Sequence, residues 1–295
     1  VFRRPTGRIV LLLHGLFETE ESWRRGATRH DGSARRPFGE RLRRDLGMTP
    51  VDLRYNTGLR ISENGRRLSR VLEALIEAWP VPVEDIAIVG HSMGGLVARS
   101  ACAVAADTEA QWPRHVRHLV TLGSPHTGAP VAKAVHVAAW AMRAVPEAAP
   151  FGAILERRSA GIRDLRFGAL RDEDWLDENP SELFVDHCGT VPLLEGCTHT
   201  FITATVTRDP DHPLGWMVGD LLVRGDSARG RHRTRAIPLD AGRVVHIGGL
   251  THFDLLDHPL VYAQLRRILD DRPAREVRRC RGRRVAEDGL PSMGF

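Results

Sequence analysis

The chain has 295 residues, of which 42% are hydrophobic and 27% are charged. This is the composition of a globular protein with enough length to bury one large core or two small ones. It excludes a chain that is disordered throughout, a collagen-like repeat and a coiled coil. The apolar run at residues 9–13 is far shorter than the roughly 18 to 20 residues that a membrane-spanning helix needs, so we expect no such helix.

The net charge of +5 is concentrated at the end of the chain. Residues 272–295 contain seven arginines and only three acidic residues, whereas the other 271 residues are nearly neutral. A folded basic face of the kind that binds nucleic acid is therefore not indicated. We expect an Arg-rich disordered tail at residues 272–295 and no nucleic-acid partner.

The beginning of the chain resembles a secretion signal only in part. Arg3 and Arg4 precede the apolar run at residues 9–13. That run is shorter than the roughly 7 to 15 residues of a signal, and no small-residue cleavage site follows it. We expect a cytoplasmic rather than a secreted protein.

Segments of strand length alternate with helical segments along most of the chain. Six strands are predicted, at residues 9–13, 51–55, 86–89, 116–122, 201–206 and 244–247. Between the second and the third, one helical face carries apolar residues at Leu68, Val71, Leu72, Leu75, Ile76 and Trp79. Further helices follow the third strand directly and occupy residues 259–269. This alternation predicts an α/β fold with a mostly parallel sheet flanked by helices.

One region interrupts the alternation. Residues 128–198 contain an Ala- and Val-rich helical stretch at 131–144, several prolines and no convincing strand. A structureless loop of that length is improbable in a compact domain, so we expect an inserted helical cap. The predicted division of the chain is core at 1–127, cap at 128–198, core at 199–271 and tail at 272–295.

A Gly-His-Ser-Met-Gly-Gly segment at residues 90–95 lies where the strand at 86–89 runs directly into a helix. It fits the Gly-x-Ser-x-Gly pattern of a nucleophile elbow, in which a strained turn exposes a serine hydroxyl. Only small residues fit at Gly90 and Gly94, and the helix N-terminus offers free N–H groups to an oxyanion. The segment predicts Ser92 as a catalytic nucleophile.

A nucleophilic serine needs a base and an orienting acid, which follow it in the order acid, histidine in an architecture with this elbow. His246 lies within the last predicted strand, and His252 and His258 come after it. His252 belongs to a Gly-Gly-Leu-Thr-His-Phe loop that leaves the carboxyl end of the strand and can turn toward the serine. We predict His252 as the base, with His246 and His258 as alternatives.

The acid is expected after the strand at residues 201–206, where the chain offers Asp209, Asp211, Asp220 and Asp226. Asp220 lies in a Gly-Asp-Leu-Leu-Val segment, whose apolar residues can anchor the loop and hold the carboxylate against the imidazole. Asp209 and Asp211 are typical turn formers. We predict Asp220, with Asp226 as the first alternative.

The His-Gly-Leu-Phe segment at residues 14–17 follows the first strand. A loop at this place can bring one backbone N–H to the oxyanion that the N–H of Met93 also faces. We predict Leu16 and Met93 as the two oxyanion donors, with Phe17 as the alternative to Leu16.

Together these segments resemble the α/β-hydrolase superfamily, specifically its bacterial serine lipases and esterases and GPI-inositol-deacylase-like relatives. The matching segments span residues 9 to about 270 and are 13–16, 90–95, 121–128, 219–223 and 250–253. The resemblance implies an α/β-hydrolase fold and ester hydrolysis with Ser92, Asp220 and His252 as the catalytic triad. It implies no cofactor.

We therefore expect a lipase- or esterase-like carboxylic-ester hydrolase that forms an acyl-enzyme with a small-molecule or lipid ester. Two alternatives stay open: an acyltransferase with the same triad, and a non-catalytic binding domain of the same fold. The stretch at residues 131–144 has two interpretations, a lid in transient contact with a lipid surface and plain cap core.

Four cysteines are too few for a disulfide scaffold in a chain of this length. His187, Cys188, Cys197 and His199 have the residue types of a zinc site, but their spacing fits no standard zinc motif. We expect no metal, with Cys188 and Cys197 either disulfide-bonded or free thiols.

Overall fold

The computed structural model describes most of the core of the protein. The described residues are 4–28, 36–128, 160–165, 168–176, 188–189, 191–206, 237, 239 and 243–271. The tail at residues 272–295 and the predicted cap helix at 131–144 lie outside them.

Six strands form one parallel sheet in the order β2-β1-β3-β4-β5-β6. They are β1 (Arg8–Leu13), β2 (Thr49–Leu53), β3 (Asp85–His91), β4 (Val116–Leu122), β5 (Thr198–Thr205) and β6 (Val244–Gly248). All six predicted strands are present. The second begins two residues earlier than predicted and the fifth three residues earlier.

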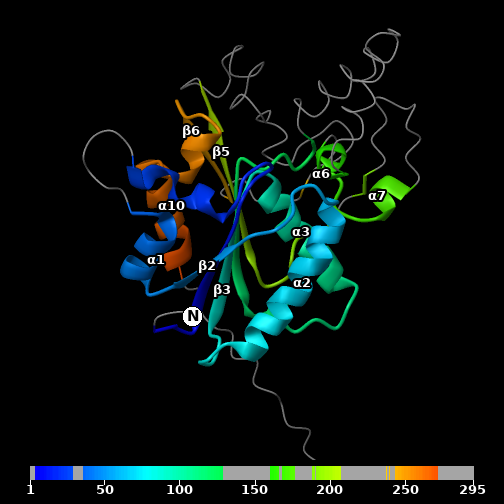
Figure 1. Ribbon diagram of the computed structural model, residues 1–295, viewed down its shortest axis with the longest axis horizontal. Helices are drawn as coiled ribbons and strands as arrows, with labels where there is room; N and C mark the ends of the chain where they lie inside the picture. The colour runs from blue at the N-terminus through cyan, green and yellow to red at the C-terminus, as the bar shows by residue number, and fades with distance from the viewer. Residues whose placement is uncertain are drawn as a thin grey trace, which may run out of the picture.

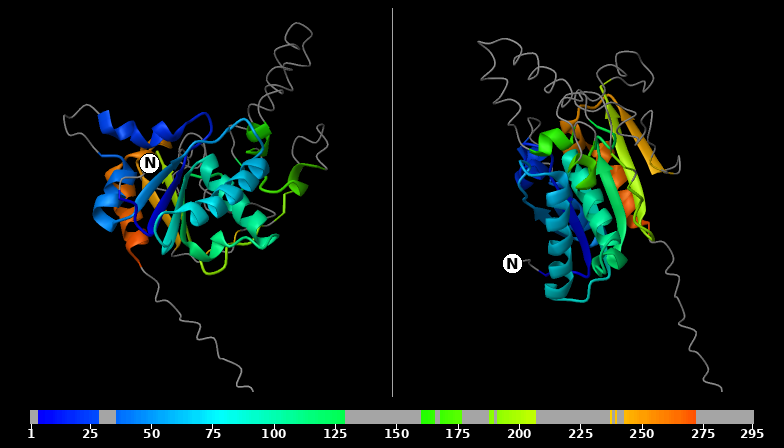
Figure 2. Two further views of the ribbon diagram at one scale, coloured as in Figure 1. Left: turned by 60° about the horizontal axis from the view of Figure 1, so that its bottom comes forward. Right: turned by 90° about the vertical axis from the view of Figure 1, so that its right-hand side faces the viewer.

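Two helical layers cover the sheet (Figures 1 and 2). One contains α1 (Phe38–Leu46) and α10 (Pro259–Asp270), and the other contains α2 (Ile61–Ala78) and α3 (Met93–Ala106). Each strand residue faces one layer or the other because side chains alternate along a strand. The confirmed fold class is therefore a parallel α/β sheet with helices on both faces.

Strand β1 shows why its sequence is a continuous apolar run. Val10 and Leu12 pack in the cluster that includes residues of α1 and α10. Ile9, Leu11 and Leu13 pack in the cluster that includes residues of α2 and α3. A strand buried on both faces has no polar side and needs apolar residues at every position.

Helix α1 is absent from the sequence-based predictions. Only Phe38, Gly39 and Leu42 are buried among its nine residues, which also include three arginines. The helix ends at Gly47, whose φ of 67° places it in the left-handed conformation common after helices. So short an apolar face gives a weak periodic signal.

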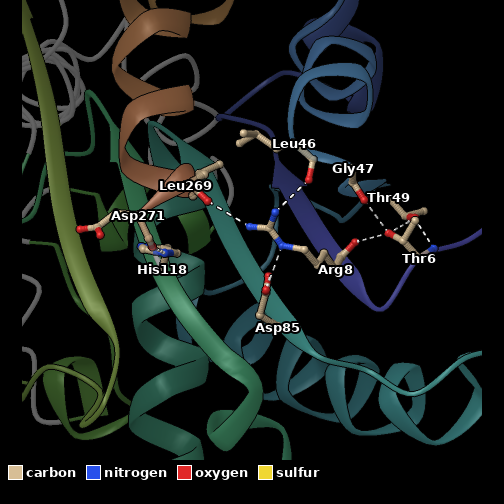
Figure 3. A network of polar contacts seen from close by, with 9 residues as sticks. All are labelled: Thr6, Arg8, Leu46, Gly47, Thr49, Asp85, His118, Leu269 and Asp271. Atoms are coloured by element: carbon tan, nitrogen blue, oxygen red, sulfur yellow. Dashed lines mark hydrogen bonds and ion pairs between the residues drawn. The ribbon is translucent and has the colours of Figure 1, made fainter. Parts of the chain in front are cut away.

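At the amino edge of the sheet, where the strands begin, the guanidinium group of Arg8 joins several segments (Figure 3). It donates to the carbonyl oxygens of Leu46 at 2.8 Å and Leu269 at 3.1 Å, and its Nε lies 3.0 Å from a carboxylate oxygen of Asp85. Leu46 and Leu269 lie in the last turns of α1 and α10, where carbonyl groups lack partners within the helix. Arg8 therefore links β1, β3 and two helix ends.

Part of the segment between β4 and β5 is attached to the core. It contains the short helices α6 (Ala160–Asp164) and α7 (Glu173–Leu176). Asp164 accepts a hydrogen bond of 2.7 Å from the backbone N–H of Ile61 at the start of α2, and it pairs with Arg60. No helix in the described part of the chain is long and apolar enough to cross a membrane. The cap itself stays a prediction.

Candidate active site

Ser92 lies alone between the last residue of β3 and the first residue of α3. Its φ of 51° and ψ of −120° are unusual for a residue with a side chain. Such a conformation costs on the order of 1–3 kcal/mol and persists where the surrounding structure enforces it. In this turn the backbone N–H of Ser92 donates to the carbonyl of Leu122 in β4, at 2.8 Å. The predicted sharp strand-to-helix turn is present.

Two glycines make this turn sterically possible. A Cβ at Gly90 would lie 2.5 Å from the backbone nitrogen of Gly95, and a Cβ at Gly94 would lie 2.6 Å from the carbonyl oxygens of Leu13 and His14. Either contact is too close for a real side chain. The end of β1 therefore lies directly against the first turn of α3, which brings the loop after β1 to Ser92.

The side chain of His252 is buried, with 2% of the residue exposed. A Cβ at Gly123 would lie 3.1 Å from Nδ1 and Cε1 of its ring. Gly123 directly follows Leu122, the residue that accepts the N–H of Ser92. Ser92 and His252 therefore both lie against the end of β4.

The two alternative histidines have other contacts. His246 projects from β6 toward β5, with Nδ1 at 3.2 Å from Thr203 Oγ1 and Nε2 at 3.1 Å from Thr205 Oγ1. His258 caps α10, where its Nδ1 accepts from the N–H of Leu260 at 3.2 Å. These contacts favour His252 as the candidate base.

The loop after β1 lies against Ser92 at Gly15. The N–H of Glu18 donates to the carbonyl of Gly15 at 3.3 Å, which closes a turn with Leu16 and Phe17 at its centre. Phe17 has a φ of 59°, as the third residue of a type II turn requires. A Cβ at Gly15 would lie 3.1 Å from Cβ of Ser92. The candidate donor Leu16 is thus next to a residue in contact with the candidate nucleophile.

Two further groups support this loop. The ring of His14 stacks on Tyr55 with 4.3 Å between ring centroids, and the Tyr55 hydroxyl donates to the His14 carbonyl at 2.6 Å. Burial lowers the pKa of His14 and raises that of Tyr55, so both rings are held neutral. These contacts attach the start of the loop to the segment after β2.

Sequence reasoning missed a buried pair beside Ser92, formed by Glu18 and His91. Oε2 of Glu18 accepts from the N–H of Gly15 at 2.7 Å and lies 3.0 Å from Nδ1 of His91. Burial lowers the pKa of His91, while the Glu18 carboxylate acts in the opposite direction. The elbow pattern predicted a role for Ser92 and none for His91 before it. No local sequence pattern connects Glu18 with His91.

Comparison with known proteins shows similarity in part of the sequence and in most of the fold. The model of the PGAP1-like alpha/beta domain matches residues 4–143, which include β1 to β4 and Ser92. The lipase BlEst2 of Bacillus licheniformis in its mature form is 16% identical, with a TM-score of 0.55, 91% of this chain and 95% of that chain covered. The chain therefore has the fold of an α/β-hydrolase lipase, and somewhat less than half of its sequence matches the PGAP1-like alpha/beta domain.

Other solved α/β-hydrolase structures are similar at comparably low identity. The Staphylococcus hyicus lipase is 14% identical, with a TM-score of 0.53, 91% of this chain and 96% of that chain covered. Phospholipase PlaB from Legionella pneumophila is 14% identical, with a TM-score of 0.50, 90% of this chain and 61% of that chain covered. A comparison with curated protein sequences found no match. At these identities the structural similarity establishes the fold.

The predicted acid and its alternatives fall in the interval between the end of β5 at Thr205 and the start of β6 at Val244. Asp220 and its alternatives Asp209, Asp211 and Asp226 lie outside the described residues. The assignment of Asp220 therefore stays a prediction.

The expected states of the cysteines and of a metal site concern residues 187–199, at and before the start of β5. Cys188 and Cys197 are thiols and form no disulfide, which decides between the two expected states. His199 accepts from the N–H of Leu194 at its Nε2, at 3.0 Å, and His187 lies outside the described residues. Within the described ranges, no group of three or more metal-ligating side chains occurs.

Proposed function

We propose that this α/β-hydrolase cleaves carboxylic esters with Ser92 as the nucleophile and His252 as the general base. The observation that carries the proposal is the strained turn at Ser92, with φ of 51°, packed against the same end of β4 as the ring of His252. A positive φ at a serine between a strand and a helix has no structural advantage and exposes the hydroxyl. Strain at such a place is typical of an active site.

The proposed reaction has two halves. Ser92 Oγ attacks the ester carbonyl carbon while His252 takes its proton, and His252 then gives the proton to the leaving alcohol. Water next attacks the acyl-enzyme, again with His252 as base, and the acid leaves as Ser92 is restored. Asp220 is proposed to orient the imidazole of His252.

The N–H groups of Leu16 and Met93 are proposed to stabilise the oxyanion of both tetrahedral intermediates. Met93 is the first residue of α3, where the N–H groups have no acceptor within the helix. Each such donor typically contributes about 2.7–4 kcal/mol to transition-state stabilisation. The turn at residues 15–18 lies against Ser92 at Gly15, and Leu16 directly follows Gly15, which supports the pairing of these two donors.

The substrate is proposed to be an ester with an apolar acyl group. Phe17 follows the candidate donor Leu16 and is 77% exposed, and Phe253 follows His252 and is 46% exposed. Large exposed apolar side chains next in sequence to the proposed catalytic residues favour contact with an apolar acyl chain. The names of the similar structures, a lipase and a phospholipase among them, agree with this substrate class.

A fluorophosphonate probe and a series of nitrophenyl esters test the proposal. We expect the probe to label the protein once per chain, at Ser92, and the esters to be hydrolysed with a preference for one range of acyl lengths. The Ser92→Ala variant should lose both reactions. An absence of labelling and of ester turnover in the unmodified protein would favour a non-catalytic binding domain.

A further inference from the structure

The carboxylate of Glu18 joins two segments that are distant in sequence. Its Oε2 accepts the N–H of Gly15 in the loop after β1, at 2.7 Å, and lies 3.0 Å from Nδ1 of His91 at the end of β3. The side chains of His91 and Glu18 are only 1% and 5% exposed. A carboxylate is rarely buried so far unless it is paired and hydrogen-bonded, because burial of an unpaired charge is costly.

The other nitrogen of the His91 ring reaches a third segment. Nε2 lies 3.2 Å from the backbone carbonyl oxygen of His252, and the two rings are 4.7 Å apart between centroids. His91 directly precedes Ser92 in the chain. A continuous series of contacts therefore runs from Gly15 through Glu18 and His91 to His252, around the candidate nucleophile.

The partners of the His91 ring determine how many protons the pair holds. A carbonyl oxygen only accepts, so Nε2 must carry a proton. A neutral ring would then present a lone pair at Nδ1 to a carboxylate oxygen that also only accepts. The short distance between Nδ1 and Oε2 therefore requires a second proton between them.

We propose that Glu18 is a positioning residue of the ester hydrolase, which shares a buried proton with His91 and so holds the oxyanion loop and the backbone of His252 around Ser92. The inference rests on the proposed function, because its consequence is catalytic. Displacement of the loop moves a donor that acts on the developing oxyanion, so the loss falls on kcat rather than on KM. Displacement of about 1 Å in such a site can cost about 10²-fold in rate.

Glu18→Gln is the most direct variant because it keeps the shape of the side chain. The amide of the new side chain can take two orientations. With its oxygen at the position of Oε2, it accepts from the N–H of Gly15 but supplies no proton to the lone pair at Nδ1 of His91. With its nitrogen there, it donates to Nδ1 but opposes the N–H of Gly15. We expect kcat to fall about 10²-fold with KM nearly unchanged, counted per serine that a fluorophosphonate titrates.

His91→Phe provides the second arm of a double-mutant cycle. In the double variant Glu18→Gln/His91→Phe, the amide oxygen is free to accept from Gly15, so the loss should be no larger than that of Glu18→Gln alone. Glu21→Gln is the matched control, since Glu21 is three residues away and its side chain is 58% exposed in a pair with Arg24. The control should keep the kcat of the unmodified protein.

Proton NMR tests the pair without any dependence on activity. We expect a strongly downfield resonance from the shared proton in the unmodified protein, in Ser92→Ala and in Glu21→Gln, and its loss in Glu18→Gln and in His91→Phe. If neither the unmodified protein nor any variant shows this resonance, the shared proton is refuted. If the protein neither hydrolyses esters nor reacts with the probe, the proposed function fails while the resonance still decides the pair.

The kinetic outcome decides the positioning role. A Glu18→Gln variant whose kcat per titrated serine equals that of the unmodified protein, with only a lower melting temperature, would overturn it. If Glu18→Gln does not fold, His91→Phe carries the same test through kcat, KM and the resonance. The double variant gives a further check. If its loss, expressed as a free energy, equals the sum of the losses of the two single variants, a shared proton is contradicted.

Discussion

The amino edge of the sheet, where the strands begin, and the carboxyl edge, where they end, each contain a buried ionisable side chain that joins distant segments. The two edges differ in what this side chain joins. At the amino edge, Arg8 contacts Asp85 and the carbonyl oxygens of Leu46 and Leu269 (Figure 3). At the carboxyl edge, Glu18 contacts Gly15 and His91. The first set of partners is made of strand starts and helix ends. The second surrounds a candidate nucleophile.

Backbone strain is distributed unequally between these edges. Among the described residues, the non-glycine residues with positive φ are Arg4, Phe17 and Ser92, and the last two lie at the carboxyl edge. Arg8 and its partners require no unusual backbone conformation, and they satisfy groups that would otherwise be left without partners. From this comparison we predict that the amino edge contributes stability and that the strain at the carboxyl edge serves the proposed reaction. Variants at each edge test this division.

Replacement of Ser92 by alanine should have the largest effect. It removes the attacking oxygen, so we expect ester turnover to fall by about 10⁶-fold, as in serine hydrolases with a triad. Thermal denaturation should show a folded protein of nearly unchanged stability. A Ser92→Ala variant that keeps more than a few per cent of the activity would exclude Ser92 as the nucleophile.

Replacement of the predicted triad acid, Asp220, should have the second largest effect on turnover. Asp220→Asn should reduce turnover by up to about 10⁴-fold, because an amide can hold the wrong tautomer of His252 while it leaves the geometry nearly intact. Asp226→Asn is the matched control and should change turnover little. Steady-state kinetics of both variants decide the assignment, and a large loss confined to Asp226→Asn would transfer the role to that residue.

Arg8→Ala is expected to act on stability alone. It leaves the carboxylate of Asp85 and two helix-end carbonyls without their partner, which should lower the free energy of unfolding by about 3 kcal/mol. Denaturant titration measures the loss, and kcat of the folded fraction should stay the same. A fall in kcat of the folded fraction would show that the two edges are coupled.

Arg24→Ala is the control for that substitution. The side chain of Arg24 is 59% exposed in its pair with Glu21, at 3.4 Å. Exposed pairs contribute about 0–1 kcal/mol. Equal losses for Arg8→Ala and Arg24→Ala would contradict the role assigned to the amino edge.

Ser92→Gly should change the free energy of unfolding by less than Arg8→Ala does, and it should raise rather than lower it relative to Ser92→Ala. Glycine adopts a positive φ without steric cost, so it relieves strain that alanine retains. Part of the gain is lost to the greater freedom of the unfolded chain, about 0.4–1 kcal/mol. We expect Ser92→Gly to be inactive and about 1 kcal/mol more stable than Ser92→Ala in denaturant titration. A less stable glycine variant would argue against stored strain at this turn.

Removal of residues 275–295 should have the smallest effect. Their sequence has no apolar periodicity with which to pack on either edge, so the melting temperature and kcat should stay nearly unchanged. Scanning calorimetry and ester kinetics check this. A drop of several degrees in the melting temperature would show that the tail contacts the body.

The strands were predictable from sequence wherever the local pattern was strong. The predicted bounds of β4 agree with the structure, and those of β1 differ by one residue. After Arg8, β1 is a continuous apolar run, and in β4 four of the seven residues are apolar. β2 begins with Thr49 and Pro50, and proline is uncommon within strands. Its predicted bounds therefore lie two residues too far toward the C-terminus. The arginine-rich helix α1 escaped prediction since its apolar face is short.

The elbow at Ser92 is a local device, so the sequence alone determined it: a strand, three glycines and a helix within a few residues leave one backbone path. The order of the helical and strand segments likewise determined a parallel sheet. Only the tertiary structure brought Glu18 to His91, because their contact spans 73 positions and depends on how β1 and β3 align. Periodicity reports which face of an element is buried, whereas a contact between the ends of two strands depends on their register and on the loops that follow them.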